Sequence, residues 1–345
     1  MESIERKKRL QGTLLGTAIG DALGLPFEGV SAKIVQRKFI KKEKYYFPGG
    51  IGVVSDDTEL SALLAQSLIK SPDDIKKVIK NFRISLLGWF LRLPWGIGLG
   101  TLRSCLKIMM GFRVTGCREG SAGNGAAMRS AILGVFINDD KEKRLHYGRN
   151  LAEITHLDKR AVDGALFVSE VAAILSQSQN LNNFYKTIEE AKSVVSSLEI
   201  KEAIDSGVKL ARGSTKAEET IKNTGYIVHT ITLITYCFLK FGNRPMDVLS
   251  NAILLGGDTD SNAAILGAWC GASYGTDWIP IKLLNKLQQG PFGKEHLERL
   301  GEAMTKESHG IVPTFSWIYS FIRNLALYPV ILVMGVGHII SNLKR

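Results

Sequence analysis

The sequence predicts an all-α fold, and three observations support this prediction. Small and apolar residues recur at three- and four-residue spacing in several long segments, which is the period of a helix with one buried face. No series of segments shows the two-residue alternation that is typical of β-strands. The chain has 345 residues, of which 45% are hydrophobic, so it can bury a large core. Length alone allows one large domain or two medium ones.

The first predicted helix covers residues 10–24 and has glycine at every fourth position, namely Gly12, Gly16, Gly20 and Gly24. Because glycine lowers helix stability, a stripe of it indicates that another helix packs very close. Pro26 ends this helix and places Glu28 on a loop. Residues 1–9 form a basic N-terminal segment without the pattern of a signal peptide, so we expect a cytoplasmic protein.

An acidic cluster, Ser55-Asp56-Asp57-Thr58-Glu59, follows a basic and aromatic stretch at residues 30–50. We expect that stretch to be an exposed excursion. The cluster opens an apolar helix over residues 59–70. After this helix comes another acidic pair, Asp73 and Asp74, whose expected role is helix capping.

Two glycine-rich loops each precede a helix. The first includes Gly98, Gly100 and Thr101 and opens a helix over residues 102–110. Backbone N–H groups at a helix N-terminus suit a diphosphate, although a tight connection explains this loop equally well. The second includes Ser121, Gly123 and Asn124.

Two further polar residues each allow a structural and a ligand-binding interpretation. Arg129, at the end of the second glycine loop, either faces a phosphate or forms a structural ion pair, and the structural role is favoured. His156 precedes a helix over residues 160–177 and either contacts a ligand or has a structural role.

A second acidic cluster, Gly256-Gly257-Asp258-Thr259-Asp260-Ser261, lies two hundred residues after the first. Before it, residues 178–225 are polar and helical, residues 226–239 form a buried apolar helix, and another helix starts at Asp247. Asp258 and Asp260 stand on the turn into a helix of small residues. One carboxylate is enough to cap that helix, so the second indicates a hard cation held by oxygen ligands. Together the two clusters can close around a metal pair.

Cysteine spacing and net charge limit which kinds of site and partner the chain can have. The four cysteines have no CxxC spacing, which argues against a disulfide framework and a zinc site. The net charge of +11 suits nucleic acid, an anionic membrane or a phosphate-bearing substrate, and a solvated basic face explains it as well.

The tail differs from the rest of the chain. Residues 325–340 carry no formal charge, but the run is shorter than the roughly 20 residues of a comfortable membrane span. It also contains Pro329. We expect residues 311–345 to form an apolar C-terminal tail that either contacts a membrane or packs on the body or on a second subunit.

Five motifs in order resemble those of ADP-ribosylglycohydrolases, the family of the dinitrogen-reductase-activating glycohydrolases and the ADP-ribosylhydrolases. The motifs are Gly16-xxx-Gly20-Asp21-Ala22-Leu23-Gly24 with Glu28, Ser55-Asp56-Asp57-Thr58, Gly123-Asn124-Gly125-Ala126-Ala127-Met128-Arg129, Thr155-His156, and Gly256-Gly257-Asp258-Thr259-Asp260-Ser261. The resemblance covers roughly residues 10–280, and we expect the domain to span residues 10–310.

The resemblance implies a compact, orthogonal multi-helix fold with a binuclear Mg²⁺ or Mn²⁺ centre at the base of an ADP-ribose cleft. It implies metal ligands at Ser55, Asp56, Asp57, Asp258, Asp260 and Ser261. The family usually has threonine at both hydroxyl positions, and serine here keeps the oxygen ligand while losing a methyl group. The diphosphate would lie on Gly98, Gly100, Thr101, Ser121, Gly123 and Asn124, with His156 contacting the ligand and Glu28 a mobile acid near the metals.

The implied reaction is hydrolysis at C1″ of an ADP-ribosylated protein side chain, linked through arginine or serine, or of a small ADP-ribose conjugate. Cleavage passes through oxocarbenium-like character, so a carboxylate near the bond can stabilise charge or deprotonate water. Glu28 is assigned as general acid or base, with Asp57 or Asp258 as alternative water activators. Two alternatives are a module that binds ADP-ribose without cleaving it and a structural, crystallin-like relative. No specific nucleic acid is expected as a partner.

Overall fold

The protein is an assembly of packed helices, as the sequence predicts. The computed structural model describes residues 2–112, 116, 122–178, 183–213, 220–305 and 312–343. Its elements are α1 (Glu2–Gly24), η1 (Leu25–Phe27), β1 (Val30–Ser31), α2 (Ala32–Lys38), η2 (Pro48–Gly50), α3 (Asp56–Lys70), α4 (Ile75–Phe90), α5 (Leu99–Met109), α6 (Ala131–Phe136), α7 (Lys141–Glu153), α8 (Lys159–Gln177), α9 (Phe184–Lys192), α10 (Leu198–Arg212), α11 (Ile227–Phe241), α12 (Pro245–Leu254), β2 (Gly256–Gly257), α13 (Thr259–Tyr274), α14 (Ile281–Lys286), α15 (Lys294–Ala303) and α16 (Trp317–Leu343).

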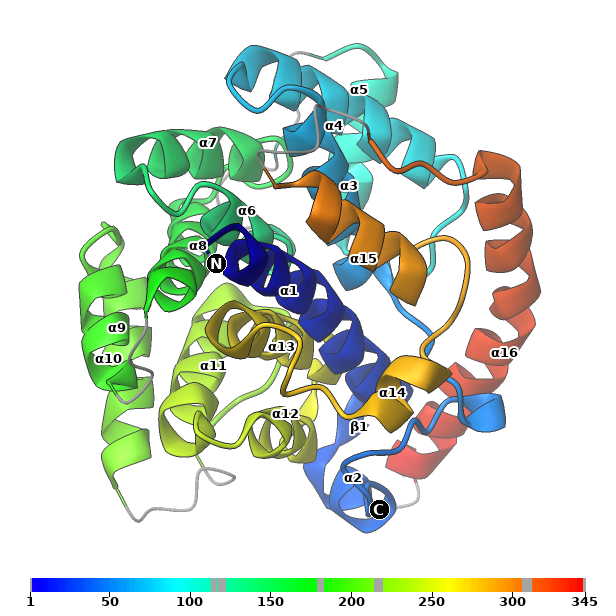
Figure 1. The fold of residues 1–345 in the computed structure, drawn as a ribbon. Coiled ribbons are helices and arrows are strands. Elements are labelled where there is room, and N and C mark those ends of the chain that lie inside the picture. The colour runs from blue at the N-terminus through cyan, green and yellow to red at the C-terminus, as the bar shows by residue number, and fades with distance from the viewer. Residues whose placement is uncertain are drawn as a thin grey trace.

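Helices α1 and α13 lie side by side at the centre of the fold and run antiparallel (Figure 1). The glycine stripe of α1 faces α13 at backbone contact. A Cβ atom on Gly16 would lie 2.1 Å from the carbonyl oxygen of Gly267, and one on Gly20 would lie 1.9 Å from that of Ala263. The prediction of a closely packed partner helix is therefore confirmed, and the small residues of α13 are the other half of the contact.

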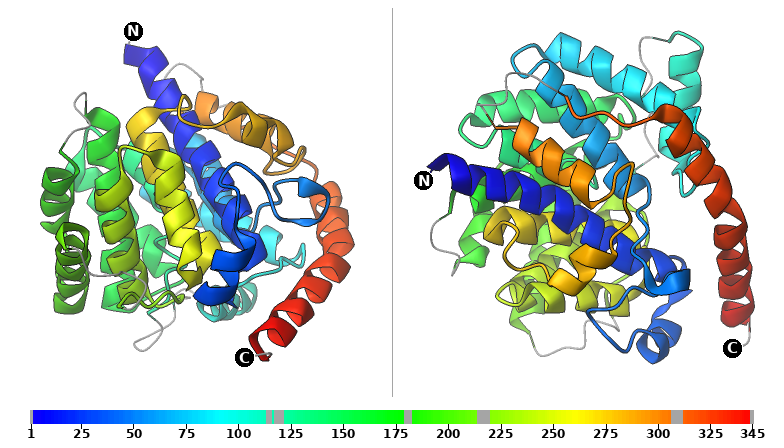
Figure 2. Two further views of the ribbon diagram at one scale, coloured as in Figure 1. Left: turned by 90° about the horizontal axis from the view of Figure 1, so that it is seen from below. Right: turned by 45° about the vertical axis from the view of Figure 1, so that its right-hand side comes forward.

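The remaining helices surround this central pair. Helices α3, α6 and α15 pack on α1, and α8, α11 and α12 pack on α13. Helices α9 and α10 form one edge of the molecule, and α16 runs along the opposite edge (Figure 2). The predicted helix over residues 226–239 is α11, whose side chains are largely buried, as expected.

The structure differs from two sequence-based expectations in the first 50 residues. Helix α1 begins at Glu2, so residues 2–9 form its first turns. Residues 30–50 were expected as an exposed excursion, but Phe39, Tyr45 and Phe47 are buried while the lysines are exposed. The physical reason is aromatic packing: Phe39 meets Phe27 edge to face at 5.6 Å between ring centroids.

Candidate active site

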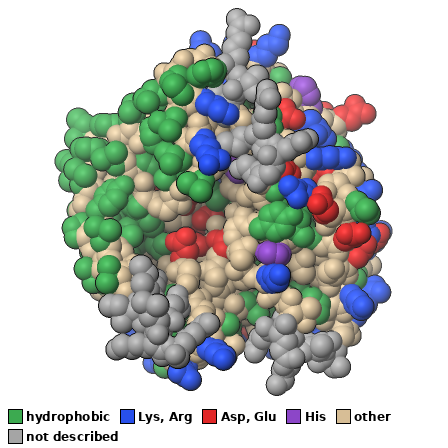
Figure 3. Space-filling view, turned by 180° about the vertical axis from the view of Figure 1, so that it is seen from behind, with side chains coloured by type: hydrophobic (Ala, Val, Ile, Leu, Met, Phe, Trp, Pro, Cys, Tyr) green, Lys and Arg blue, Asp and Glu red, His purple; other side chains and the backbone are tan. Residues whose placement is uncertain are grey.

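The predicted site residues meet around a cavity of about 560 Å³. The N-termini of α3, α5 and α13 all contribute to its wall, so three positive helix ends surround it. The lining residues are Glu28, Gly29, Asp56, Asp57, Gly96, Gly98, Leu99, Gly100, Thr101, Gly123, Asn124, Gly125, Met128, His156, Asn223, Thr224, Gly225, Gly257, Asp258, Asp260 and Ser261. In space-filling view, acidic side chains are visible in a hollow at the centre of one face (Figure 3).

A short ladder between β1 and β2 fixes the Glu28 loop beside the second acidic cluster. Val30 pairs with Gly257 and Ser31 with Gly256, and Gly29 N donates to Gly257 O at 2.8 Å. Both glycines of β2 have positive φ angles, 65° and 75°. A Cβ on Gly257 would also lie 2.0 Å from the backbone oxygen of Asn223. Glycine is therefore required at both positions, and it brings Glu28 next to the start of α13.

The first acidic cluster is the N-terminus of α3, with Ser55 as its cap. Ser55 Oγ accepts from Asp57 N at 3.3 Å and lies 3.2 Å from Asp57 Oδ2, to which it donates. Asp21 of α1 supports the turn from beneath, because its Oδ2 accepts from Ser55 N at 2.9 Å and from Thr58 Oγ1 at 2.5 Å. Asp56 and Asp57 thereby face the cavity, whereas Ser55 lies behind its lining.

The second acidic cluster is the N-terminus of α13 and is tied directly to the first. Ser261 Oγ donates to Asp57 Oδ2 at 3.3 Å. Asn124 Nδ2 donates to Asp258 Oδ2 at 2.6 Å, which joins the second glycine loop to the same cluster. Asp260 accepts from the backbone N–H of Ser261 through Oδ1 at 3.0 Å. The two half-sites predicted from sequence are thus one site in the fold.

The carboxylates of this site repel one another in a poorly solvated place. Burial raises the pKa of Asp57 well above its ordinary value, and the charges of Asp21 and Asp258 raise it further. Burial also raises the pKa of Asp260 well above its ordinary value, and the charge of Glu28 adds to the effect. Within the part of the chain that the structure describes, no Lys, Arg or His forms an ion pair with Asp56, Asp57, Asp258 or Asp260 in compensation.

The donor set of the site fits divalent cations. Oδ1 of Asp57 is buried and has no hydrogen-bond partner, so this oxygen is left for another positive group. Carboxylate and hydroxyl oxygens are the ligands of Mg²⁺ and Mn²⁺. As the side chains stand, no three His, Cys, Asp or Glu residues among those described form a closed metal-binding group.

Glu28 lies at the mouth of the cavity on an exposed loop, as predicted from Pro26. Removal from bulk water raises the pKa of Glu28 to about 7, the charge of Asp258 also raises it, and a hydrogen bond with Asp260 opposes both. A carboxyl group with such a pKa exchanges protons near neutral pH, which is the property of a general acid or base.

The two glycine loops form adjacent parts of the polar wall, since a Cβ on Gly125 would lie 3.5 Å from Thr101 Oγ1. Gly98 caps α5, and Gly100 and Thr101 lie in its first turn, so the first loop is shorter than expected. The second loop is held by residues 223–227: Asn124 N donates to Gly225 O at 2.9 Å, and Ile227 N donates to Ala122 O at 2.9 Å. Gly123 and Asn124 line the cavity. Ser121, also predicted as a phosphate contact, lies outside the described residues.

His156 and Arg129 have separate roles. The buried Arg129 guanidinium donates to Thr155 Oγ1 at 2.7 Å and to the carbonyl of Gly125, so its role is structural, as favoured from sequence. Thr155 Oγ1 lies 2.8 Å from His156 Nδ1 and fixes the ring orientation. Burial and the nearby Arg129 lower the pKa of His156 to about 3, so the ring is neutral at the cavity wall.

Sequence reasoning missed two parts of the site. Asp21 was quoted within a motif but given no role, although it holds the turn that carries Asp56 and Asp57. Residues Asn223, Thr224 and Gly225 line the cavity. Their polar stretch has no motif, and only its glycine hinted at a close approach of backbone segments.

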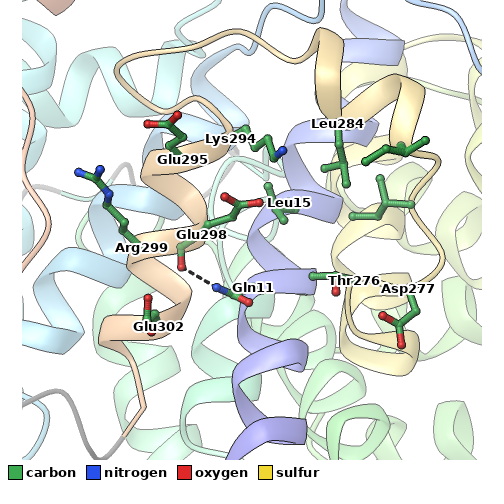
Figure 4. Close-up of a pocket in the computed structure, with 12 residues that line it drawn as sticks. Gln11, Leu15, Thr276, Asp277, Leu284, Lys294, Glu295, Glu298, Arg299 and Glu302 are labelled. Carbon is green, nitrogen blue, oxygen red and sulfur yellow. Dashed lines mark hydrogen bonds between the residues drawn. The ribbon is translucent and has the colours of Figure 1, made fainter.

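A second hollow of about 620 Å³ lies between α1, α14 and α15 (Figure 4). It shares no residue with the first cavity. Two of its four acids are paired, Glu302 with Lys7 and Asp277 with Lys8. Gln11 Nε2 donates to the backbone oxygen of Glu298 at 2.9 Å. This hollow holds none of the motif residues, so the first cavity is the candidate active site.

Comparison with known proteins agrees with the motifs. The sequence model of the ADP-ribosylglycohydrolase family matches residues 2–311. An ADP-ribosyl-[dinitrogen reductase] glycohydrolase of Rhodospirillum rubrum is 27% identical over 81% of this chain and 90% of its own length. An ADP-ribosylarginine hydrolase, Tri1, of Serratia proteamaculans is 24% identical over 88% of this chain and 80% of its own.

The fold has a solved counterpart. A chain described as an ADP-ribosylglycohydrolase-related protein complex superimposes with a TM-score of 0.68 at 24% identity, covering 88% of this chain and 99% of that one. The fold, the clustered motifs and the family match over residues 2–311 lead to one conclusion: the chain belongs to the ADP-ribosylglycohydrolase family, a family of hydrolases acting on glycosidic linkages of ADP-ribose.

Proposed function

We propose that the protein is a divalent-metal-dependent hydrolase that cleaves the C1″ glycosidic bond of ADP-ribosylated protein side chains or small ADP-ribose conjugates and releases ADP-ribose. The observation that carries this proposal is the convergence of Glu28 and both acidic clusters on one cavity. The name of the Serratia relative favours an arginine linkage, and a serine linkage is the second candidate.

The metal ligands in this proposal are Ser55, Asp56, Asp57, Asp258, Asp260 and Ser261, holding two Mg²⁺ or Mn²⁺ ions. Bound divalent cations supply two things here: they orient ribose hydroxyls and lower the pKa of a water molecule. The unpaired Oδ1 of Asp57 supports this assignment. Ser55 lies behind the cavity lining and donates to Asp57 Oδ2, so its hydroxyl group would have to turn from Asp57 to reach a metal ion.

The polar wall suits the diphosphate of the substrate. Gly98, Gly100 and Thr101 present the N-terminus of α5, where free N–H groups and the helix dipole favour an anion. Gly123, Gly125 and the neutral His156 continue this wall beside Thr101. The diphosphate would therefore lie along this wall, with the distal ribose toward the acidic clusters.

Glu28 is placed to move the proton in this reaction. Its carboxyl group stands at the exposed end of the acidic cluster, beside Asp258 and Asp260. It would give a proton to the leaving nitrogen or oxygen, or take one from the attacking water. Asp57 and Asp258 lie deeper and remain the alternative groups for activating water.

The proposal also includes a cellular location and a partner. We propose a cytoplasmic location, supported by three buried free thiols, Cys105, Cys237 and Cys270. The partner in this proposal is an ADP-ribosylated protein, with no specific nucleic acid.

The test is release of ADP-ribose from arginine-linked and serine-linked model conjugates in Mn²⁺, Mg²⁺ or EDTA. We expect metal-dependent release from at least one conjugate and a loss of about 100-fold or more in Asp258→Ala. Asp73→Ala is the matched control, because Asp73 is an exposed acid outside the cavity. Tight, metal-dependent binding without turnover would replace the hydrolase with a binding module.

A further inference from the structure

Helix α16 lies beyond the residues that match the family and has two different faces. Its inner face is attached to the body. Leu327, Tyr328, Ile331 and Met334 pack on a separate apolar cluster of Leu25, Phe47, Val53 and Trp95. The outer face is apolar and exposed, at Ile318, Ile322, Leu325, Leu332, Val333 and Val336. Leu332 is 64% exposed and Val333 74%, which is far from the burial of a core helix.

Polar side chains fix this helix against the body in its present orientation. Asn324 Nδ2 donates to Arg92 O at 2.9 Å, and the Tyr328 hydroxyl donates to Leu93 O at 3.2 Å. Arg323 pairs with the buried Glu59 and donates to Val54 O at 3.0 Å. The helix is long and apolar enough to cross a membrane, with 11% of that window buried. These bonds are consistent with a helix that lies in the plane of a surface and does not cross it.

The exposed apolar surface continues from α16 onto the neighbouring loop and α5. Leu91 and Leu93 are exposed before α5, Leu99, Leu106 and Met109 are exposed on it, and Met110 and Phe112 are exposed directly after it. Figure 3 shows hydrophobic side chains gathered on one side of the face that contains the acidic hollow. Leu99 also lines the cavity, so this surface reaches the mouth of the candidate active site.

The charge of this surface has a single sign. Residues 75–112 and 312–343, which supply all of these apolar groups, contain no Asp or Glu. Their exposed cations are Arg103 on α5 and Lys76, Lys77 and Lys80 on the adjoining α4, where Lys77 pairs with Asp74. A basic face that only contacts solvent would not expose so many large apolar side chains. A surface that binds another protein has no physical reason to contain no Asp or Glu. Apolar side chains with cations alone are the pattern of a helix that binds an anionic lipid surface.

We propose that α16, the loop at residues 91–98 and α5 together form a docking surface for an anionic membrane. In this arrangement α16 lies in the headgroup region with Ile322, Leu332 and Val333 inserted. The cavity mouth then faces the lipid surface, beside Leu99. This inference does not depend on the proposed reaction.

The test is co-sedimentation of the full chain with vesicles of phosphatidylcholine, with or without phosphatidylglycerol, at low and high salt. We expect binding to the anionic vesicles that weakens with salt. Val333→Asp should lower the partition coefficient about tenfold or more, and Arg103→Glu about tenfold. The matched controls are Leu198→Asp and Lys209→Glu on α10, whose side chains are also exposed and should not alter binding.

Amide hydrogen exchange on vesicles locates the contact. Residues 99–112 and 317–337 should exchange more slowly with anionic vesicles, while α10 should not change. Equal binding to neutral vesicles, or equal loss in the α10 controls, would overturn the proposal. So would the absence of vesicle binding together with a dimer in sedimentation that Val333→Asp dissociates, since the surface would then hold a second copy. Resistance of bound protein to alkaline carbonate extraction would show a crossing helix and would also overturn it.

Discussion

At the scale of single residues, the site depends on buried carboxylate oxygens, some of which have no hydrogen-bond partner. Asp21 is fully buried, and its Oδ2 takes three hydrogen bonds from Ser55 and Thr58. Asp57 keeps one oxygen unpaired. Burying an unpaired carboxylate oxygen costs free energy, so such an arrangement persists where a function requires it.

The protonation of His296 gives a prediction at the same scale. Its Nδ1 accepts from Phe292 N at 3.1 Å, and its ring lies 4.7 Å from Phe315. Burial lowers the pKa of His296 to about 4, while a bond to the Pro313 carbonyl opposes this and the cations Arg299 and Arg92 add to it. The unfolded chain has a pKa near 6.5. Between these values the unfolded state binds more protons, so stability is complete above about pH 6.5 and falls as the pH drops toward 4.

This loss is measurable with a variant that does not titrate. From pH 7 to pH 5 the free energy of unfolding of the wild type should fall by about 2 kcal/mol relative to His296→Gln. Urea unfolding of both proteins at the two pH values measures the difference. A difference that stays constant with pH would show that His296 keeps its ordinary pKa in the fold.

At the scale of elements, the contact between α1 and α13 is set by glycine. In Gly16→Ala the new Cβ would lie 2.1 Å from the backbone oxygen of Gly267, and neither helix backbone can give way locally. We expect a loss of about 2–3 kcal/mol in the free energy of unfolding. Gly88→Ala in α4 is the control, since nothing lies within 4 Å of its Cβ, and it should stabilise by about 0.5–1 kcal/mol. Equal effects of the two substitutions in urea unfolding would contradict the close packing.

The attachment of α16 includes one buried ion pair, between Arg323 and Glu59. Glu59 also accepts from Trp89 Nε1 at 2.8 Å, so Arg323→Met leaves a buried carboxylate with one neutral partner. The expected loss of stability is about 3 kcal/mol or more. Lys7→Met removes the exposed pair with Glu302 and should cost less than about 1 kcal/mol. Chemical unfolding measures the free energy of unfolding of both variants. Similar losses in the two variants would show that this ion pair does not couple α16 to the core.

At the scale of the whole molecule, the proposed metal site gives a prediction for thermal stability. Divalent cations that bind only the folded state would raise the melting temperature by about 4 °C for each bound ion at a concentration near 100 times the dissociation constant. In EDTA, Asp260→Asn should melt above the wild type, because it removes one of the repelling carboxylates. It should also gain less from Mn²⁺. Scanning calorimetry with Mn²⁺ and with EDTA decides this, and a variant that responds to Mn²⁺ like the wild type would exclude Asp260 as a ligand.

Much of the local structure could be predicted from the sequence. Hydrophobic periodicity predicted helices at α3, α8, α11 and α13. Pro26 predicted the end of α1 and the position of Glu28 on a loop. The helix boundaries were less accurate at two N-termini. Ser55 caps α3, which therefore begins at Asp56, and α5 begins at Leu99, so that Gly100 and Thr101 belong to a helix.

By itself the sequence determined the helical class, the five motifs and the identity of the carboxylates, because these depend on neighbours along the chain. The tertiary structure alone decided that Asp57 and Ser261 touch, that Asp21 supports Ser55, and that residues 223–225 close the cavity. The tertiary structure also decided where the tail lies, because its apolar sequence is compatible with a core helix, a membrane contact or a partner interface. The physical reason is that these contacts join segments far apart in the chain, and their free energies arise only when packing brings them together.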